Sequence, residues 1–274
     1  MNNVENFKNY LRLRYKAKFN NHQSGDPIID SRHFCNIKRE WDKVSKYIID
    51  KCLNNPELTL VDKIKNVFLA RIHNRVETLE GISYPKKQYN IKEKDLIYKQ
   101  NPHAYRVQKL LKRLQIDYKW EGTEWEVANY LDVIFKDIDK YNWEESFETT
   151  FKNFCSILNL YEQSFIAYQF ALDMDYLFHY KDIDEFVIIG PGAVRGINMI
   201  YYFDLFEGVN KDEFTQRIKN VDYLEELKKL RDEVNNTFEK DNIYLHLNDI
   251  EFNLCEYCKW CALSNGIKTT QRRH

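Results

Sequence analysis

The sequence predicts an all-α fold. Only 8 glycines and 5 prolines punctuate its 274 residues, so few positions interrupt a regular backbone. Between them, apolar residues recur at spacings of three and four, which is the period of an amphipathic helix and leaves little room for strands. Apolar residues make up 43% of the chain and charged residues 30%, which is typical of a globular protein. We therefore expect one helical domain over residues 1–274.

Two helices are predicted in the first third of the chain. From Ser31 to Cys52 the apolar side chains form one stripe, and polar residues occupy the other face. A second helix is expected from Leu60 to Glu80, because Gly81 follows and glycine commonly ends a helix. Residues 82–150 begin as a polar, lysine-rich stretch, and we interpret them as a variable helical insertion.

The most apolar stretch of the chain runs from Phe151 to Phe178. It predicts a central buried helix that is interrupted near Asp173–Asp175. Further helices are expected from Val194, from Lys211 and from Asn242.

The overall charge does not favour nonspecific binding to nucleic acid. Lys and Arg number 41 and Asp and Glu number 42, which gives a formal charge of −1. Any contact with DNA must therefore come from a local patch. The segment Lys8–Lys18 carries five cations and no acid, so it either faces phosphate or forms a solvated helix face.

The cysteines and the hydropathy indicate a cytoplasmic protein. Six cysteines are too sparse for the disulfide framework of a secreted chain of this length. We find no signal peptide and no apolar run of the roughly 18 residues that a membrane helix needs. Cys255, Cys258 and Cys261 resemble part of a metal site, but no fourth ligand lies near them in sequence. We therefore predict no metal, no cofactor, no membrane contact and a monomer.

A Gly-Pro-Gly turn is the sharpest local feature. Gly190, Pro191 and Gly192 follow a short apolar run and precede a predicted helix, so free backbone N–H groups are expected at a helix N-terminus. Such a site suits a DNA phosphate, and helix-hairpin-helix DNA glycosylases use a similar hairpin. A simple tight turn is the competing interpretation.

Carboxylates near the end of the most apolar stretch are candidates for catalysis. Desolvation raises the pKa of a buried acid, and a fixed carboxylate stabilises the positive charge that develops on a sugar during glycosidic cleavage. Asp173 is the first candidate for that role, and Glu256 is a second acid. A structural ion pair between Asp173 and an arginine is the alternative.

Two groups of polar residues lie on helices whose other face is apolar. Asparagine reads a base edge through two hydrogen bonds, and arginine holds a phosphate. Salt bridges between helices are the competing account. The two groups are Asn36, Arg39 and Asp42, and Arg71, Asn74 and Arg75.

Four segments, in order, resemble the α-glutamyl/putrescinyl-thymine pyrophosphorylases, a helical family that acts on modified bases in DNA. The first two are Asp26–Lys43, preceded by Arg14, and Asn66–Arg75. The third and closest stretch is Phe165–Tyr176, followed by residues 184–196. The last is Asp249 with Leu254–Lys259, which resembles a Cys-Glu-x-x-Lys signature. The resemblance implies a fold like that of DNA glycosylases, DNA as the partner, and kinship with a bacterial antiphage branch.

The resemblance leads to the hypothesis of a DNA glycosylase. The enzyme would flip a bulky modified pyrimidine, such as glucosylated hydroxymethylcytosine in phage DNA, and cut its N-glycosidic bond. The two polar groups above would line the pocket, while Gly190–Gly192, Arg195 and Lys259 would hold phosphate. Asp212, about twenty residues beyond the turn, is a lower-ranked catalytic candidate.

Two other functions stay open. One is a transferase that displaces phosphate or pyrophosphate from an activated hydroxymethyluracil in DNA with an amine. The other is a noncatalytic reader of modified DNA. The chain carries no P-loop motif, so we do not expect it to make an activated base itself.

Overall fold

The computed structural model describes residues 3–80, 113–115, 127–162, 164–202 and 216–266. In these ranges the regular elements are helices and no strand occurs, so the all-α prediction is confirmed. None of the helices in these ranges is long and apolar enough to cross a membrane.

The chain divides into two compact units. Unit 1 combines both ends of the chain, Met1–Asp42 and Asp184–His274, and unit 2 is the continuous segment Lys43–Ile183. The expectation of one domain over residues 1–274 stays a prediction, and each unit is described by itself below.

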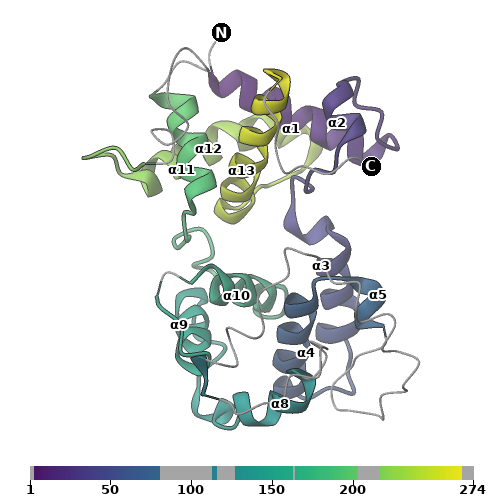
Figure 1. The fold of residues 1–274 in the computed structure, drawn as a ribbon, viewed down its shortest axis with the longest axis vertical. Helices are drawn as coiled ribbons and strands as arrows, with labels where there is room; N and C mark the ends of the chain where they lie inside the picture. The colour runs from purple at the N-terminus through teal and green to yellow at the C-terminus, as the bar shows by residue number, and fades with distance from the viewer. Residues whose placement is uncertain (1–2, 81–112, 116–126, 163, 203–215, 267–274) are drawn as a thin grey trace. The chain divides into compact units, whose positions relative to one another are not determined.

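Unit 1 is built around its last helix, α13 (Figure 1). Helices α1, α2, α11 and α12 pack against it and bury the aromatic side chains of Phe7, Tyr10, Tyr223 and Tyr257. The elements of unit 1 are α1 (Asn3–Phe19), α2 (Pro27–Ser31), η1 (Arg39–Trp41), α11 (Pro191–Tyr201), α12 (Tyr223–Phe238), η7 (Glu239–Asp241) and α13 (Leu247–Ser264).

Two glycines let α11 approach α13 closely. A Cβ atom at Gly192 would overlap Sγ of Cys255, and one at Gly196 would lie 2.8 Å from Cβ of Leu254. These two glycines are four residues apart and therefore share one face of α11. The position of α13 in unit 1 thus depends on the absence of side chains at these two sites.

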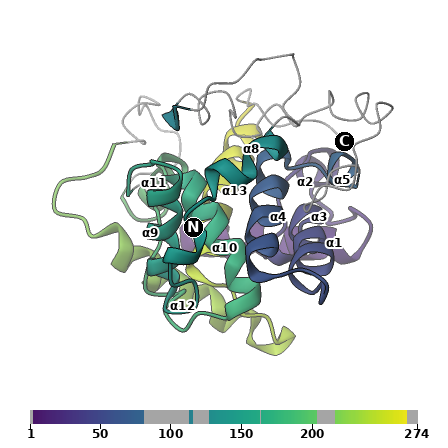
Figure 2. The same ribbon diagram turned by 90° about the horizontal axis from the view of Figure 1, so that it is seen from below.

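Unit 2 packs α4 and α9 against α10, and the three helices lie side by side (Figure 2). Phe68, Phe154 and Phe170 meet in its core, with ring centroids 5.1 and 5.4 Å from that of Phe170. Its elements are α3 (Lys43–Tyr47), η2 (Ile48–Leu53), α4 (Leu60–His73), α5 (Val76–Leu79), α8 (Val127–Ile134), η5 (Ile138–Lys140), α9 (Phe147–Ile157) and α10 (Phe165–Phe178).

The predicted helix from Ser31 to Cys52 is wrong as a single element. The guanidinium of Arg14 donates hydrogen bonds to the carbonyls of Phe34 and Cys35, at 2.8 and 2.9 Å. Carbonyls held by a side chain do not take part in a helical ladder. The region therefore divides into α2, η1, α3 and the π-helix η2.

The next two predicted helices are also divided. A capping box at Thr59 starts α4, but Asn74 ends it in a left-handed conformation, φ 47°, before the short α5. The stretch Phe151–Phe178 breaks between α9 and α10, where Asn159 also has φ 47°. The backbone is helical through Asp173–Asp175, so the predicted interruption there is wrong.

The predicted helices after residue 190 and the predicted insertion agree with the structure to different degrees. The helix expected from Val194 is α11, which starts at Pro191, and the one expected from Asn242 is α13, which starts at Leu247. The start expected at Lys211 lies outside the described residues. Much of the proposed insertion also lies outside them, but its described end buries Leu131, Phe135 and Trp143 in unit 2.

Candidate functional site

One buried face of α13 carries polar side chains. Asp249, Asn253 and Glu256 are spaced by four and three residues, so they lie on the same side of the helix. Each is buried, with 3%, 0% and 5% of its surface exposed. We call these three residues the α13 polar face. A polar stripe inside a core is costly unless its atoms are hydrogen-bonded, so each partner matters.

Asp249 links the start of η1 to the start of α13. Its Oδ1 accepts the backbone N–H of Arg39 at 2.9 Å, and its Oδ2 accepts that of His246 at 3.2 Å. Burial raises the pKa of Asp249 to about 6, although both hydrogen bonds act in the opposite direction. Asn253 adds a second link, because its amide donates to the carbonyl of Ile37 at 2.8 Å.

Asn36 and Asp42 meet in the same loop. The side-chain amide of Asn36 donates to Oδ1 of Asp42 at 2.6 Å. This bond closes the loop that begins where Arg14 holds the carbonyls of Phe34 and Cys35. Three residues proposed to bind substrate, Asn36, Arg39 and Asp42, are thus held close to α13 in unit 1.

Glu256 and Lys259 form an ion pair on α13. The Glu256 side chain is 7% exposed and the Lys259 side chain 37%, so the ammonium is the part of the pair that reaches solvent. The hydroxyl of Tyr10 is buried and has no hydrogen-bond partner among the described residues. Burial raises the pKa of Tyr10 well above its usual value, and the charge of Glu256 raises it further.

The Gly-Pro-Gly turn opens α11, with Gly190 as its N-cap and Pro191 in the first turn. The N–H of Gly190 donates to Oε1 of Glu251 at 3.0 Å, so a carboxylate of the protein already occupies this donor. Burial raises the pKa of Glu251 to about 7, against the effect of that hydrogen bond. Binding of phosphate by this turn, or by Arg195 further along α11, stays a prediction.

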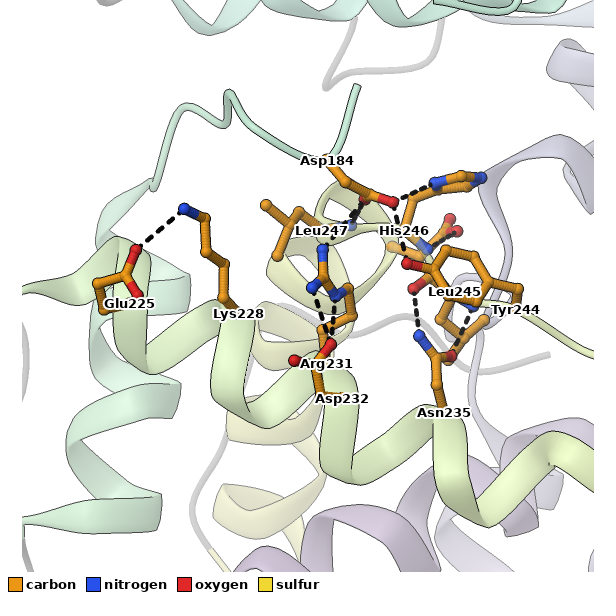
Figure 3. A network of polar contacts seen from close by, with 11 residues as sticks. Asp184, Glu225, Lys228, Arg231, Asp232, Asn235, Tyr244, Leu245, His246 and Leu247 are labelled. Carbon is orange, nitrogen blue, oxygen red and sulfur yellow. Dashed lines mark hydrogen bonds and ion pairs between the residues drawn. The ribbon is translucent and has the colours of Figure 1, made fainter. Parts of the chain in front are cut away.

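A second polar network fixes the start of α13 (Figure 3). Asp184 accepts hydrogen bonds from the Leu247 N–H at 2.8 Å and the Tyr244 hydroxyl at 3.1 Å, and its Oδ2 lies 3.0 Å from Nδ1 of His246. Arg231 of α12 lies between Asp184 and Asp232. Burial alone would raise the pKa of Asp184, but these hydrogen bonds lower it below its usual value. The network fixes the first turn of α13, the helix that carries the α13 polar face.

Unit 2 contains a different polar cluster, in which Arg71 and Asp173 form a bidentate ion pair. Nε and Nη2 of Arg71 lie 2.5 and 2.6 Å from the two carboxylate oxygens of Asp173, which is fully buried. The same Nη2 donates to Oγ of Ser45 at 2.8 Å. Both oxygens of Asp173 are therefore engaged by one guanidinium.

Asn74 and Arg75, which the sequence groups with Arg71, also have partners close to them in the chain. Asn74 is the C-cap of α4, and its Oδ1 lies 3.5 Å from Nη1 of Arg71. Arg75 pairs with Glu77 at 3.1 Å near the surface. His73 is fully buried, neither ring nitrogen has a hydrogen-bond partner in the described part of the chain, and burial lowers its pKa to about 4.

The predicted site residues thus form two groups in two units. Unit 1 holds Asn36, Arg39, Asp42, Gly190–Gly192, Arg195, Glu256 and Lys259, and unit 2 holds Arg71, Asn74, Arg75 and Asp173. The idea that both groups line one cavity stays a prediction. Asp212 lies outside the described residues.

The sequence alone does not mark Glu251 as a site residue, and it marks Asp249 only as part of a signature. The spacing of Asp249, Asn253 and Glu256 along an otherwise apolar helix is the signal that marks the α13 polar face. No pattern marks Ser45, because its contact with Arg71 depends on how α3 and α4 pack. Among the described residues, no group of three metal-binding side chains is present.

Comparisons with known proteins give the family. The family model described as "5-hmdU DNA kinase, helical domain" matches residues 4–268. The chain is also 26% identical over 203 residues to the 5-hmdU DNA kinase of Bacillus phage SP10. That alignment covers 64% of this chain and 31% of the relative, so the chain corresponds to less than a third of that protein. No solved structure matches the chain.

These findings correct two expectations. The prediction of a DNA glycosylase is wrong, because the relative is named a kinase, which is a transferase and not a hydrolase. The resemblance to the thymine pyrophosphorylases pointed to DNA-base modification but to the wrong branch of it. Asp173 and Glu256 were expected to assist glycosidic cleavage, and that role no longer applies without a glycosylase reaction. The chain belongs to the family of the 5-hmdU DNA kinase helical domain.

Proposed function

We propose that this chain binds DNA containing 5-hydroxymethyluracil and takes part in group transfer at the hydroxymethyl oxygen of that base. The observation that carries the proposal is the family match over residues 4–268, together with a relative that is named a kinase of 5-hmdU in DNA. A transferase was the alternative to the glycosylase, and it now becomes the main interpretation.

The chemistry of the reaction sets what a site must provide. When a phosphoryl group is transferred, a bond forms between the hydroxymethyl oxygen and phosphorus, and the bond from phosphorus to its leaving group breaks. The hydroxyl proton then needs an acceptor, and the negative charge of the phosphoryl group needs cations.

Unit 1 offers groups of both kinds. Glu251 has a pKa of about 7, so near neutral pH a large fraction can accept a proton. Lys259 has a partly exposed ammonium, which makes it the candidate for contact with a transferred phosphoryl group or a DNA phosphate. In this proposal Asn36, Arg39 and Asp42 line the face of α13 that carries Asp249 and Glu256.

The unit 2 residues have a smaller part in the proposal. Arg71 holds Asp173 with two nitrogens and Ser45 with one of them, so we assign it a structural role. Arg75 lies closer to the surface, and we keep it as a candidate for contact with the DNA backbone.

The direct test is product analysis. DNA containing 5-hydroxymethyluracil is incubated with the chain and a nucleoside triphosphate, and DNA carrying the phosphorylated base is incubated with the chain and an amine. After digestion to nucleosides, mass spectrometry should detect a product heavier by the transferred group. An unchanged nucleoside pool in both reactions would leave only a reader of modified DNA and would overturn the proposed transfer.

Matched lysine variants test the site. Lys259→Ala should lower the yield of product at least about tenfold, since one charge-assisted contact contributes roughly 1.5 to 3 kcal/mol. Lys240→Ala, in the exposed η7, removes the same charge elsewhere on unit 1 and should leave the yield unchanged.

A further inference from the structure

A row of cations on α1 ends in an exposed aromatic ring. Lys8, Arg12, Lys16 and Phe19 are spaced by four, four and three residues, so they share one face of the helix. Arg12 and Lys16 are exposed, and Phe19 has 59% of its surface exposed. We call these four residues the α1 stripe.

Two further rings hold Phe19 in place. Its ring centroid lies 4.8 Å from that of Tyr15 and 5.4 Å from that of Trp41, with the Trp41 ring nearly perpendicular at 83°. Tyr15 also packs against Phe238 of α12, with centroids 6.1 Å apart. Phe19 therefore stays exposed while its neighbours fix its position from the protein side.

The charges of the stripe are only partly balanced. Lys8 pairs with Glu5 at 2.9 Å, whereas neither Arg12 nor Lys16 forms an ion pair with any residue that the structure describes. Lys16 acts electrostatically on Asp30, whose oxygens already accept hydrogen bonds from Ser24 and Gly25. Two cations are thus presented to solvent along one helix face.

We propose that the α1 stripe binds a single strand of DNA, with phosphates along Arg12 and Lys16 and an unpaired base stacked on Phe19. Proteins that bind single strands combine a basic track with aromatic platforms in this way. From Lys8 to Phe19 the stripe is about 16 Å long at about 1.5 Å per residue. That is the axial rise of about five stacked nucleotides at about 3.4 Å each.

The buried face of α1 argues against a membrane as the partner. An interfacial helix inserts a wide apolar face into the bilayer. The apolar face of α1, with Val4, Phe7 and Leu11, is instead buried in the core of unit 1. Phe19 is the large apolar side chain that this helix exposes.

The α1 stripe would hold the DNA strand next to the modified base, so this inference rests on the proposed function. It takes only the polymer, DNA, from the proposed function. A strand of unmodified thymine has no hydroxymethyl group, so it tests the α1 stripe without testing recognition of the modified base. Failure of one proposal is therefore distinguishable from failure of the other.

The first measurement uses fluorescence anisotropy with a labelled twelve-residue oligothymidylate. Phe19→Ala should weaken binding about tenfold, because stacking of one base contributes roughly 1 to 3 kcal/mol and about 1.4 kcal/mol is a factor of ten. Phe165→Ala removes a comparable ring, 46% exposed, from unit 2 and should leave the affinity unchanged. Equal affinities for the wild type and Phe19→Ala would overturn the proposal.

The second measurement is the salt dependence of the same binding. Single strands give a slope of about −0.7 in log affinity against log salt for each neutralised phosphate. Replacing both Arg12 and Lys16 with Gln should therefore make the slope shallower by about 1.4. An unchanged slope, or equal binding of the wild type to vesicles of phosphatidylglycerol, would contradict a DNA strand as the partner. Circular dichroism of each variant verifies that α1 still folds.

Discussion

Asp173 carries a buried carboxylate that Arg71 engages at both oxygens. The two hydrogen bonds are 2.5 and 2.6 Å long, and Nη2 of the guanidinium also donates to Oγ of Ser45. Removal of one partner from such a pair leaves the other charge uncompensated in a low-dielectric environment. The pair is therefore expected to matter for the stability of unit 2.

The first prediction follows from this geometry. Asp173→Asn should lower the free energy of unfolding by roughly 3 to 5 kcal/mol, because the Arg71 charge stays buried without its counterion. Urea unfolding measures the change. Glu77→Gln breaks the surface pair with Arg75 and should cost no more than about 1 kcal/mol. Similar losses in the two variants would contradict the assignment of a structural role to Arg71 and Asp173.

The second prediction concerns the pH dependence that Glu251 introduces. Burial raises its pKa from 4.5 to about 7, so the folded state holds a proton that the unfolded state releases between these values. The linkage relation then requires stability to fall as pH rises from about 4.5 to about 7, and to level off above it.

Glu251→Gln removes the titrating carboxyl and therefore tests whether Glu251 makes stability fall as pH rises. The variant should lose the part of this fall that Glu251 causes, which is on the order of 3 kcal/mol for the full shift at about 1.4 kcal/mol per pKa unit. Thermal or urea unfolding across this range measures it. Glu185→Gln, at an exposed glutamate of unit 1, should retain the wild-type slope. If the stability of Glu251→Gln varies with pH as that of the wild type does, Glu251 is not the group that causes the pH dependence.

Residue roles were only partly predictable from the sequence. The sequence identified Asp173 and an arginine partner as an alternative to catalysis, since a lone acid inside an apolar run needs a counterion. It did not identify Glu251, because the contact with the N–H of Gly190 joins residues far apart in the chain.

At the scale of elements, the contact between α11 and α13 has the most specific geometry. Gly192 and Gly196 face Cys255 and Leu254, and side chains at these positions would overlap them. The same contact includes a hydrogen bond, because the N–H of Gly190, at the start of α11, donates to Glu251 of α13.

The third prediction tests that contact. Gly192→Ala should destabilise the protein by about 1 to 3 kcal/mol, because the added methyl group overpacks the helix interface. A double-mutant cycle with Cys255→Ala measures the coupling, since removal of Sγ clears the closest overlap. The double variant should regain part of the lost stability. Additive effects of the two substitutions would show that the overlap is not the cause.

Helix positions were predictable where local rules decide them. The capping residues Thr59 and Asn74 bound α4, and both residue types favour these positions. The helix expected from Ser31 to Cys52 failed because Arg14, on another element, holds the carbonyls of the loop. Periodicity alone does not report such tertiary contacts.

At the scale of the molecule, the two units differ in how the chain forms them. Unit 2 is one continuous segment, whereas unit 1 needs residues from both ends of the chain. A continuous segment with its own apolar core is expected to fold by itself.

The fourth prediction is that Lys43–Ile183 folds when it is produced alone. It should show a helical circular dichroism spectrum and one cooperative urea transition, because its rings at Phe68, Phe154 and Phe170 pack within the unit. A spectrum without helix, or a transition without cooperativity, would show that unit 2 depends on the rest of the chain.

The function was predictable from the sequence only to the level of DNA-base modification. The signatures in residues 26–43 and 249–259 meet in unit 1, through the hydrogen bond between Arg39 and Asp249. These segments carry acids, amides and cations. Acids serve proton transfer and cations serve phosphate contact in a hydrolase as well as in a transferase. Residue types alone therefore did not separate the two reactions, and the family match did.

If the chain binds 5-hydroxymethyluracil in DNA as proposed, it must distinguish that base from thymine, and a competition binding experiment measures this difference. Two oligonucleotides that differ only in the single hydroxyl oxygen of one base compete for the protein. The hydroxymethylated strand should bind at least about tenfold more tightly, since a site built for a hydroxyl leaves polar groups unpaired without it. Equal affinity for the two strands would contradict the proposed recognition of the modified base.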